Sequence, residues 1–368
     1  MIYLDYQATT PLAPEAVAAM RPWLEDKFAN PHSPSRWGSE AAAAVEVARR
    51  NVEAAIGLEG GSLAFTGSAT EALNWALKGT VEKASGARNR IVTVQTEHAA
   101  LLDSCQWLEA RGVEVTYLRV GSDGLLDLDE LKAVLDERVL IVAVMLVNNE
   151  IGVIQPVGEI AAAAHAVGAL MLCDAVQGLG RIQIPDGPDL VAVSGHKIHG
   201  PKAIGALWMR DGAEPEPLIH GGGQEGGLRS GTLSPALCAG FGAAAKLGSA
   251  GSAHVERLWN AAWQVLGRDW TLNGSARQRY HGNLNIRRQG LDSTRLLADL
   301  RNIAFSLGSA CASGSGRPSH VLRALGLSDR DARSSIRIGF GRYTTEEQLV
   351  TALRLIDEAA EAQDKFAA

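Results

Sequence analysis

Short apolar runs alternate with helical segments between about residue 62 and residue 209, and this alternation restricts the fold more than any other feature. The longest run, Val139 to Val147, is nine residues long, which suits a strand buried on both faces. Further strands are expected at 62–65, 90–94, 113–118, 169–173, 190–193 and 205–209. Apolar strands separated by helices predict a largely parallel sheet between layers of helices. Ligands of such sheets bind at the carboxyl ends of the strands.

The pattern changes near Lys246, and a second, smaller unit is expected beyond it. Residues 248–252 are small and polar enough for a flexible connection. A helix at 255–266, short strands near 282–286 and 335–339, and a terminal helix from Thr345 follow. We therefore predict an α/β large domain over residues 14–245 and a smaller α+β domain from residues 1–13 and 246–368. The expected helices of the large domain are 14–26, 39–56, 69–78, 99–111, 129–136 and 157–167.

The bulk composition excludes several classes of protein. Apolar residues make up 46% and charged residues 21%, as in ordinary globular proteins. A net charge of -6 argues against nucleic acid or an anionic membrane as the main partner. Neither a signal peptide nor an apolar segment of membrane-spanning length is evident. The four cysteines, Cys105, Cys173, Cys238 and Cys311, show no metal-ligand spacing, so a reducing cytoplasm and no metal are expected.

The stretch from Ser194 to Lys202 contains the most unusual side chain. Lys197 follows the apolar run 190–193, and Asp174 ends another apolar run 23 positions earlier. A lysine and an acid at two strand ends suit a planar cofactor with a cationic nitrogen. Pyridoxal phosphate enzymes need such a pair, a Schiff-base lysine and a carboxylate partner for the pyridinium nitrogen. Taken singly, Lys197 is better explained as a loop lysine and Asp174 as a turn former, but the pair is not.

Other polar residues follow the remaining strands. The turn from Thr66 to Ala72 joins a strand to a helix and suits a phosphate cradle, although a plain helix cap explains it too. His98 could stack on a flat cofactor and move protons, or be structural. The amides of Asn148 and Asn149 could bind a substrate or cofactor oxygen, or cap the next turn.

The glycine-dense segment 220–232 contains possible phosphate ligands. They are Arg229, Ser230 and Thr232. As an alternative, the segment is a flexible linker.

These motifs together resemble the cysteine desulfurases, pyridoxal phosphate enzymes of the class V aminotransferase fold. The chain looks closest to the group that serves iron–sulfur cluster assembly and tRNA thiolation. The resemblance runs nearly end to end, through residues 3–11, 67–71, 96–98, 147–152, 174–177, 194–197, 220–232, 306–311, 318–326 and 334–337. It implies pyridoxal phosphate fold type I, with a mainly parallel seven-stranded sheet in the large domain.

The resemblance implies roles for individual residues around the cofactor ring. Lys197 would be the Schiff-base lysine and Asp174 the pyridinium partner. His98 would stack on the ring and assist proton transfer, and Gln177 would contact the phenolic oxygen.

The resemblance also implies how the phosphate and the substrate are held. The phosphate ligands would be Ala69, Thr70, Ser194 and His196, with Thr232 contributed by the neighbouring subunit of a homodimer. Asn149, which also borders the cofactor, and Arg337 would bind the substrate carboxylate, for which an arginine fork is well suited.

Cys311 matches the sulfur-accepting nucleophile of the family. Its neighbours from Gly308 to Gly316 are almost all small or polar, which predicts an accessible thiol. The resemblance implies that Lys197 removes the Cα proton of L-cysteine and that the Cys311 thiolate attacks the substrate sulfur, leaving a persulfide and releasing alanine. The spacing to Pro318 resembles the longer of two loop types, which implies direct handover of sulfur to an acceptor or scaffold protein.

Three positions depart from the family pattern, and two rival functions remain open. The segment 30–35 lacks the usual histidine, Gln7 stands where small residues are common, and Gly226-Gly227 replaces a more charged stretch. One rival is an aminotransferase or β-lyase that does not need Cys311. The other is an inactive scaffold of the same fold, against which the joint presence of the site residues argues.

Overall fold

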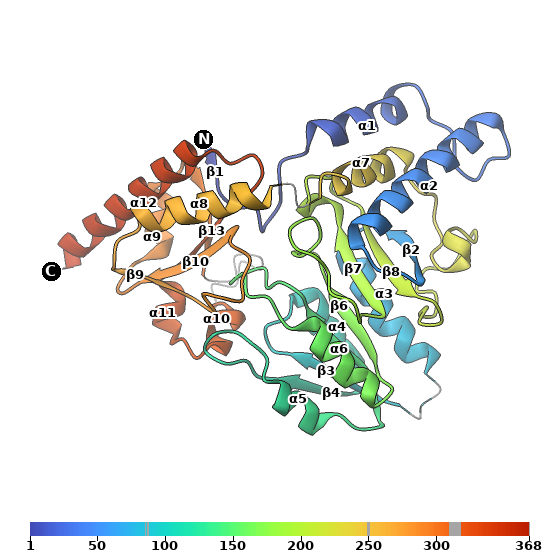
Figure 1. Cartoon of the computed structure of the whole chain (residues 1–368), viewed down its shortest axis with the longest axis horizontal. Helices are drawn as coiled ribbons and strands as arrows, with labels where there is room; N and C mark the ends of the chain where they lie inside the picture. Colours follow the sequence, from blue (N-terminus) through green and yellow to red (C-terminus); the bar gives the residue numbers. More distant parts are fainter. Residues whose placement is uncertain (85, 87, 249–250, 309–317, 368) are drawn as a thin grey trace.

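The computed structural model shows a molecule of two lobes, with both chain termini in the same lobe (Figure 1). It describes residues 1–84, 86, 88–248, 251–308 and 318–367. The larger lobe contains seven strands, β2 (Gly61–Thr66), β3 (Arg90–Val94), β4 (Glu114–Leu118), β5 (Val139–Met145), β6 (Leu170–Asp174), β7 (Leu190–Ser194) and β8 (Gly205–Arg210). Its helices are α1 (Pro14–Glu25), α2 (Arg36–Ile56), α3 (Ala69–Lys83), α4 (Ala99–Glu109), α5 (Leu128–Val134), α6 (Val157–Ala166) and α7 (Pro235–Ala245), with 3-10 turns η1 (Gly195–Lys197) and η2 (Glu225–Gly227).

The strands of the larger lobe form one sheet in the order β2-β8-β7-β6-β5-β3-β4. Neighbouring strands pair in parallel except at β8, which is antiparallel to both β2 and β7. The predicted α/β class and mainly parallel seven-stranded sheet are therefore confirmed. The parallel strands β5, β6 and β7 all end at the same edge, which brings Asp174 and Ser194 to one side of the sheet.

Both faces of the sheet are covered by helices, and β5 shows why its sequence is apolar throughout. Val142 and Val144 pack in a core with residues of α2, α6 and α7, whereas Ile141 and Ala143 pack on the opposite face against residues of α3 and α4. Alternate side chains of a strand point to opposite faces, so a strand covered on both sides needs no polar position.

The smaller lobe is built on an antiparallel sheet in the order β12-β13-β10-β9. Its strands are β9 (Trp270–Leu272), β10 (Asn283–Arg288), β12 (Ser306–Leu307) and β13 (Ser335–Gly339), while β1 (Ile2–Tyr3) pairs with β11 (Ile303–Ala304). Its helices are α8 (Ser252–Val265), α9 (Ser293–Asp299), α10 (His320–Ala324), α11 (Asp329–Arg333) and α12 (Glu346–Ala367). A separate apolar core joins the sheet to α8 and α12. This separate core supports a division near residues 13 and 246, which we keep as a proposal.

Several element boundaries differ from the sequence-based expectations. Helix α2 begins at Arg36 rather than Ser39, because the Ser35 side chain accepts a hydrogen bond from the Gly38 amide and caps the helix. Its expected end at residue 56 is confirmed, and Gly57 follows in the left-handed region with φ of 74°. Helix α3 runs five residues beyond the expected Lys78, to Lys83. None of the described helices is both long and apolar enough to span a membrane.

Candidate functional site

A cavity of about 280 Å³ lies where strands β5, β6 and β7 end. It brings together nine of the predicted site residues from separate parts of the chain. Those lining it are Ala69, Thr70, His98, Asn149, Asp174, Gln177, Ser194, His196 and Lys197. Topology explains the convergence, because side chains that follow parallel strands collect at the carboxyl edge of the sheet.

Asp174 is the last residue of β6 and is buried in the wall of this cavity. Its Oδ1 accepts a hydrogen bond from the Val176 amide at 3.0 Å. Burial raises the pKa of this carboxyl, while the charges of His98 and Lys197 act to lower it. A buried carboxylate gains most from a cationic partner placed in the cavity.

The amino-terminal turn of α3 forms one end of the cavity. Ser68 caps the helix by accepting a hydrogen bond from the Glu71 amide. The first amides of a helix lack internal partners, so the N–H groups of Ala69 and Thr70 are available to an anion. The Glu71 carboxylate accepts from the Gly67 amide at 2.7 Å and pairs with Arg229 at 2.8 Å. Arg229 therefore neutralises an acid beside the anion site instead of lining the cavity itself.

Ser194 and His196 reach the same cavity from the end of β7 and from η1. Ser194 is buried, and His196 Nδ1 lies 3.1 Å from the Thr9 hydroxyl. Burial, together with the positive charges of Lys197, Lys202 and Arg181, lowers the pKa of His196 to about 4. The imidazole is therefore neutral near pH 7 and acts on an anion as a hydrogen-bond partner rather than a cation.

Lys197 ends η1, and its Nζ donates hydrogen bonds to the backbone oxygens of Gln7 at 2.6 Å and Ala8 at 2.8 Å. Burial lowers the pKa of this amine to about 8, with further lowering from Arg181 and Arg337. A fraction of the amine is thus uncharged near neutral pH, as a nucleophile or a proton acceptor requires.

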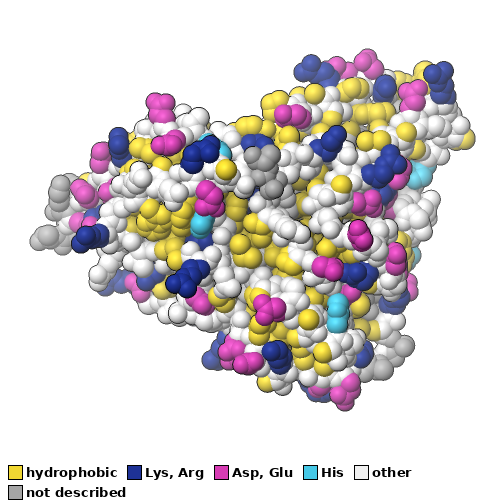
Figure 2. Space-filling view, in the orientation of Figure 1, with side chains coloured by type: hydrophobic (Ala, Val, Ile, Leu, Met, Phe, Trp, Pro, Cys, Tyr) yellow, Lys and Arg dark blue, Asp and Glu magenta, His cyan; other side chains and the backbone are white. Residues whose placement is uncertain are grey.

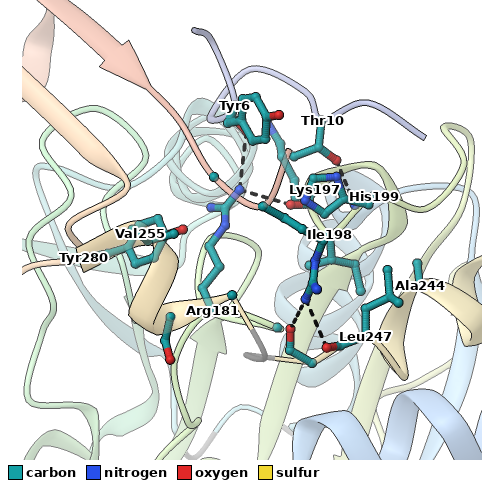
Figure 3. Close-up of a pocket in the computed structure, with 16 residues that line it drawn as sticks. Tyr6, Thr10, Arg181, Lys197, Ile198, His199, Ala244, Leu247, Val255 and Tyr280 are labelled. Atoms are coloured by element: carbon teal, nitrogen blue, oxygen red, sulfur yellow. Dashed lines mark hydrogen bonds between the residues drawn. The ribbon is translucent and has the colours of Figure 1, made fainter. Parts of the chain in front are cut away.

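Arg181 lies directly beside the backbone of Lys197, in a second cavity of about 50 Å³ that shares Lys197 (Figure 3). Its Nη2 donates to the backbone oxygens of Lys197 at 3.0 Å and Tyr6 at 3.3 Å. Among the described residues, no acidic side chain forms a salt bridge with Arg181. Its charge lowers the pKa of Lys197, whereas Asp5 and Asp174 act to raise it. The sequence offered one signal for this role, since Arg181 follows Gln177 by four residues in the same turn region.

The three other predicted cofactor contacts in the cavity differ in how firmly they are held. His98 caps α4, and its Nδ1 accepts from the Ala100 amide at 3.1 Å, so a neutral ring carries its proton on Nε2. The Gln177 amide is already engaged, because its Nε2 donates to the Gln7 oxygen at 2.9 Å and its Oε1 accepts from Arg181. Asn149 lines the cavity, and its backbone oxygen accepts from Asn283 at 3.3 Å.

Asn148 does not line the cavity. Its Oδ1 accepts from the amides of Glu150 and Ile151, so it caps the turn, which is the alternative interpretation of the doubled amide.

Arg337 approaches the site from β13 of the smaller lobe. Its Nη1 donates to the Asn149 backbone oxygen at 3.0 Å, which places it beside the cavity without lining it. Its Nη2 pairs with Asp5 at 2.8 Å. Asp5 was not selected as a site residue from the sequence, although it lies in one of the motifs that carry the resemblance.

One predicted site residue lies elsewhere, and one is not described. Thr232 is exposed and does not line the cavity. Cys311 lies outside the described residues. The residues on either side of its segment are joined, because the Ser319 amide donates to the Gly308 oxygen at 3.2 Å. His320, which follows, donates through Nε2 to the Glu97 oxygen at 3.0 Å, next to His98.

Glu97 is a further residue that sequence reasoning missed. Its Oε1 accepts from the Met145 amide at 2.8 Å, and its Oε2 is buried without a hydrogen-bond partner. Burial raises the pKa of this carboxyl well above its usual range. Through its hydrogen bond with the Met145 amide, Glu97 ties the turn that carries His98 to the end of β5.

This chain is similar to known proteins both in sequence and in architecture. Residues 2–351 match the aminotransferase class-V family. Cysteine desulfurase IscS from Rickettsia bellii (strain OSU 85-389) is 43% identical over 96% of this chain and 90% of that protein. IscS from Rickettsia rickettsii (strain Iowa) is 42% identical over the same shares.

Among solved structures, a NifS-like protein superimposes with a TM-score of 0.89 at 32% identity, covering 97% of this chain and 98% of the other. A structure of SspA in complex with cysteine gives a TM-score of 0.83 at 33% identity, covering 94% and 100%. The extent of these matches and the cavity at the strand ends lead to one assignment. The chain belongs to the class V aminotransferase family and, within it, to the cysteine desulfurases.

Proposed function

We propose that this protein is a pyridoxal phosphate-dependent cysteine desulfurase that converts L-cysteine to L-alanine and transfers the sulfur to Cys311. The observation that carries the proposal is the convergence of Lys197 and Asp174 on one cavity beside an anion-binding helix terminus. The relatives named cysteine desulfurase add support over nearly the whole chain. From Cys311 the sulfur would pass to an acceptor or scaffold protein of iron–sulfur cluster assembly.

The residues of the cavity fit pyridoxal phosphate at both ends. A protonated ring nitrogen would supply the cation that buried Asp174 lacks, and this cation would lower the raised pKa of the carboxyl. The amides of Ala69 and Thr70, with Ser194 and His196, offer hydrogen bonds to the phosphate group. Lys197 is the amine that would hold the cofactor covalently. When bound, the cofactor accepts the electron pair left at the substrate Cα after proton removal.

The chain itself would supply binding and proton transfer. The uncharged Nζ of Lys197 would take the Cα proton, and its lowered pKa places that amine in the working range of a general base. Arg337 would bind the substrate carboxylate, with the Asn149 side chain beside it. The Cys311 thiolate would attack the substrate sulfur, forming an S–S bond as the C–S bond breaks. The substrate Cβ and Cα would then each gain a proton, and L-alanine would leave.

We further propose a homodimer in which Thr232 serves the cofactor of the partner subunit. Three large apolar side chains near the junction of α1 and α2 are exposed: Leu24 to 67%, Phe28 to 82% and Trp37 to 64%. Figure 2 shows hydrophobic side chains along the upper edge of the molecule, over α1. Phe28 and Trp37 meet edge to face at 6.0 Å. A cluster of this kind on an otherwise charged surface is typical of a protein interface.

The cysteines support a reducing compartment, which we propose is the cytoplasm. Cys105, Cys173 and Cys238 are free thiols, all buried. Burial raises the pKa of Cys105 and Cys238 to about 12, which keeps these thiols protonated and unreactive.

The Cys311→Ser variant tests the proposed reaction directly. We expect the purified variant to retain the visible absorbance of bound cofactor but to form neither a persulfide nor alanine from L-cysteine. Cys173→Ser, at a buried thiol of the core, is the matched control and should retain activity if it folds. Release of sulfide with pyruvate by Cys311→Ser at the wild-type rate would favour a β-lyase instead, and formation of the keto acid that retains the thiol would favour an aminotransferase.

A further inference from the structure

Arg337 has an internal carboxylate partner. Its Nη2 donates to Asp5 Oδ1 at 2.8 Å and to the Ser306 hydroxyl at 2.8 Å, and this hydroxyl donates to the same Asp5 oxygen at 2.9 Å. The three groups close a ring of hydrogen bonds. The side chains are mostly buried, with Arg337 11% and Asp5 18% exposed, so water weakens this ion pair less than it would a surface pair.

One donor of the same guanidinium is unpaired. The Nε of Arg337 is buried and has no hydrogen-bond partner among the described residues, whereas Nη1 donates to the Asn149 oxygen. A guanidinium binds a carboxylate best through two parallel N–H groups. Both such pairs of this guanidinium, Nε with Nη2 and Nη1 with Nη2, include Nη2. A ligand carboxylate bound through two N–H groups must therefore share Nη2 with Asp5 and Ser306.

The backbone holds Asp5 firmly in this position. Asp5 forms an isolated β-bridge with Gly339, two residues beyond Arg337 on the same strand. The backbone oxygen of Asp5 also accepts hydrogen bonds from the Ala8 amide at 2.9 Å and from the Tyr3 hydroxyl at 3.2 Å. These contacts fix the backbone of Asp5, and its carboxylate can leave Arg337 only by giving up its hydrogen bonds from Arg337 and Ser306.

We propose that Asp5 is an internal counter-ion of Arg337 that competes with the carboxylate of the amino-acid substrate and so sets how tightly that carboxylate is held. This inference rests on the proposed function, in which Arg337 is the carboxylate site. Asp5 thereby lowers the affinity of the site for α-carboxylates, product as well as substrate, and favours release of alanine. It makes Asp5 a specificity-determining residue of the substrate side.

Removing the charge while keeping the shape separates competition from positioning. In Asp5→Asn, Oδ1 still accepts the hydrogen bonds of Arg337 and Ser306, but the negative charge is gone. By Coulomb's law, a unit charge about 5 Å from the bound carboxylate changes its affinity about fourfold at the dielectric constant of water, and by more than about a hundredfold at an effective dielectric constant of about 20. We therefore expect L-alanine to bind the holoenzyme of the variant at least about fourfold more tightly than the wild type.

The test is an absorbance titration of the holoenzymes with L-alanine and, separately, with ethylamine, which has the amine but no carboxylate. Tighter binding of L-alanine with unchanged ethylamine binding supports the proposal. Equal or weaker L-alanine binding in Asp5→Asn overturns it, and weaker binding would mean that Asp5 only positions Arg337. Asp129→Asn, on the exposed face of α5, is the matched control and should bind both ligands as the wild type does.

Two further measurements keep the result interpretable. Asp5→Ser is a second neutral variant for the case in which Asp5→Asn does not retain the cofactor, and the same direction of change is expected. Alanine formation from L-cysteine by the wild type is measured in parallel. Its absence would contradict the proposed desulfurase function, whereas an unchanged L-alanine affinity in both neutral variants would contradict only the role of Asp5.

Discussion

The two walls of the site are built differently. On the large-sheet wall, β6 ends in the Asp174 carboxylate, which accepts one backbone hydrogen bond and has no salt-bridge partner among the described residues. The first turn of α3 adds the amides of Ala69 and Thr70, which the helix itself leaves unpaired. On the small-sheet wall, Arg337 is already paired with Asp5. The first wall is ready for a permanent cofactor. The second must exchange an internal partner for a ligand, which suits a substrate that enters and leaves in every turnover.

This difference matches the physical demands on the two walls. A group that stays bound is held best by preformed and otherwise unsatisfied donors and acceptors, because they lose nothing when the group enters. A substrate site that bound the product equally tightly would slow its release. Substitutions on the two walls should therefore have separable effects.

The largest effect is expected from Lys197→Ala, because Lys197 would both hold the cofactor and act as the general base. The variant lacks the amine that would hold the cofactor and that would take the Cα proton. Alanine formation should fall by about 10³-fold or more, given the usual contribution of general base catalysis alone. Lys202→Ala, an exposed lysine five residues away, is the control and should keep most of the activity. If Lys197→Ala turned over L-cysteine at the wild-type rate, the roles proposed for Lys197 in this site would be contradicted.

A smaller effect, confined to the cofactor wall, is expected from Arg229→Ala. Without Arg229, the Glu71 carboxylate beside the first turn of α3 is no longer neutralised. An uncompensated charge of this kind should weaken binding of the cofactor phosphate about tenfold. Cofactor dissociation constants, measured by fluorescence or absorbance after dialysis, check this prediction.

The comparison predicts a specific pattern for Arg229→Ala. Its affinity for L-alanine, measured at saturating cofactor, should match the wild type, which is the reverse of Asp5→Asn. Arg138→Ala, in a surface ion-pair cluster at the opposite edge of the sheet, is the matched control. Equal losses of cofactor and L-alanine affinity in Arg229→Ala would show that the two walls are not separable.

The smallest effect is expected in the pH profile of Arg181→Gln. Burial lowers the pKa of Lys197 to about 8, and the Arg181 charge contributes to that lowering. Removing this charge should raise the pKa. Because the amine accepts a proton only when it is uncharged, kcat falls as pH drops through this pKa. The acid limb of kcat against pH should therefore move to higher pH, by up to about one unit.

An unmoved or lowered acid limb in Arg181→Gln would contradict the electrostatic role of Arg181. Arg181 also donates to the backbone oxygens of Tyr6 and Lys197, so the thermal unfolding midpoint of the variant should be measured alongside. Glutamine can replace only part of these hydrogen bonds, and a lower midpoint is expected.

The sequence predicts the large-sheet wall well for a physical reason. Asp174 and Lys197 directly follow apolar runs, and the carboxyl ends of parallel strands meet at one edge of the sheet. Their convergence therefore follows from strand order alone. The antiparallel direction of β8 does not follow, because an apolar run buried on both faces looks the same in either direction.

The small-sheet wall is largely invisible to sequence reasoning. Asp5 and Arg337 are 332 positions apart, and strands β1, β11 and β12 each have only two residues, too few to show any periodicity. The family resemblance implies a carboxylate-binding role for Arg337 but gives no partner for it in the free protein. The pairing depends on the way the amino-terminal segment crosses between the lobes.

The most direct measurement is the mass of the peptide that contains Cys311, taken after the holoenzyme has reacted with L-cysteine. We predict the added mass of one sulfur atom on Cys311, removable by a thiol reductant, together with alanine in solution. Cys105, Cys173 and Cys238 should remain unmodified because they are buried. Alanine formation without sulfur on Cys311, or sulfur on a different cysteine, would contradict the proposed route.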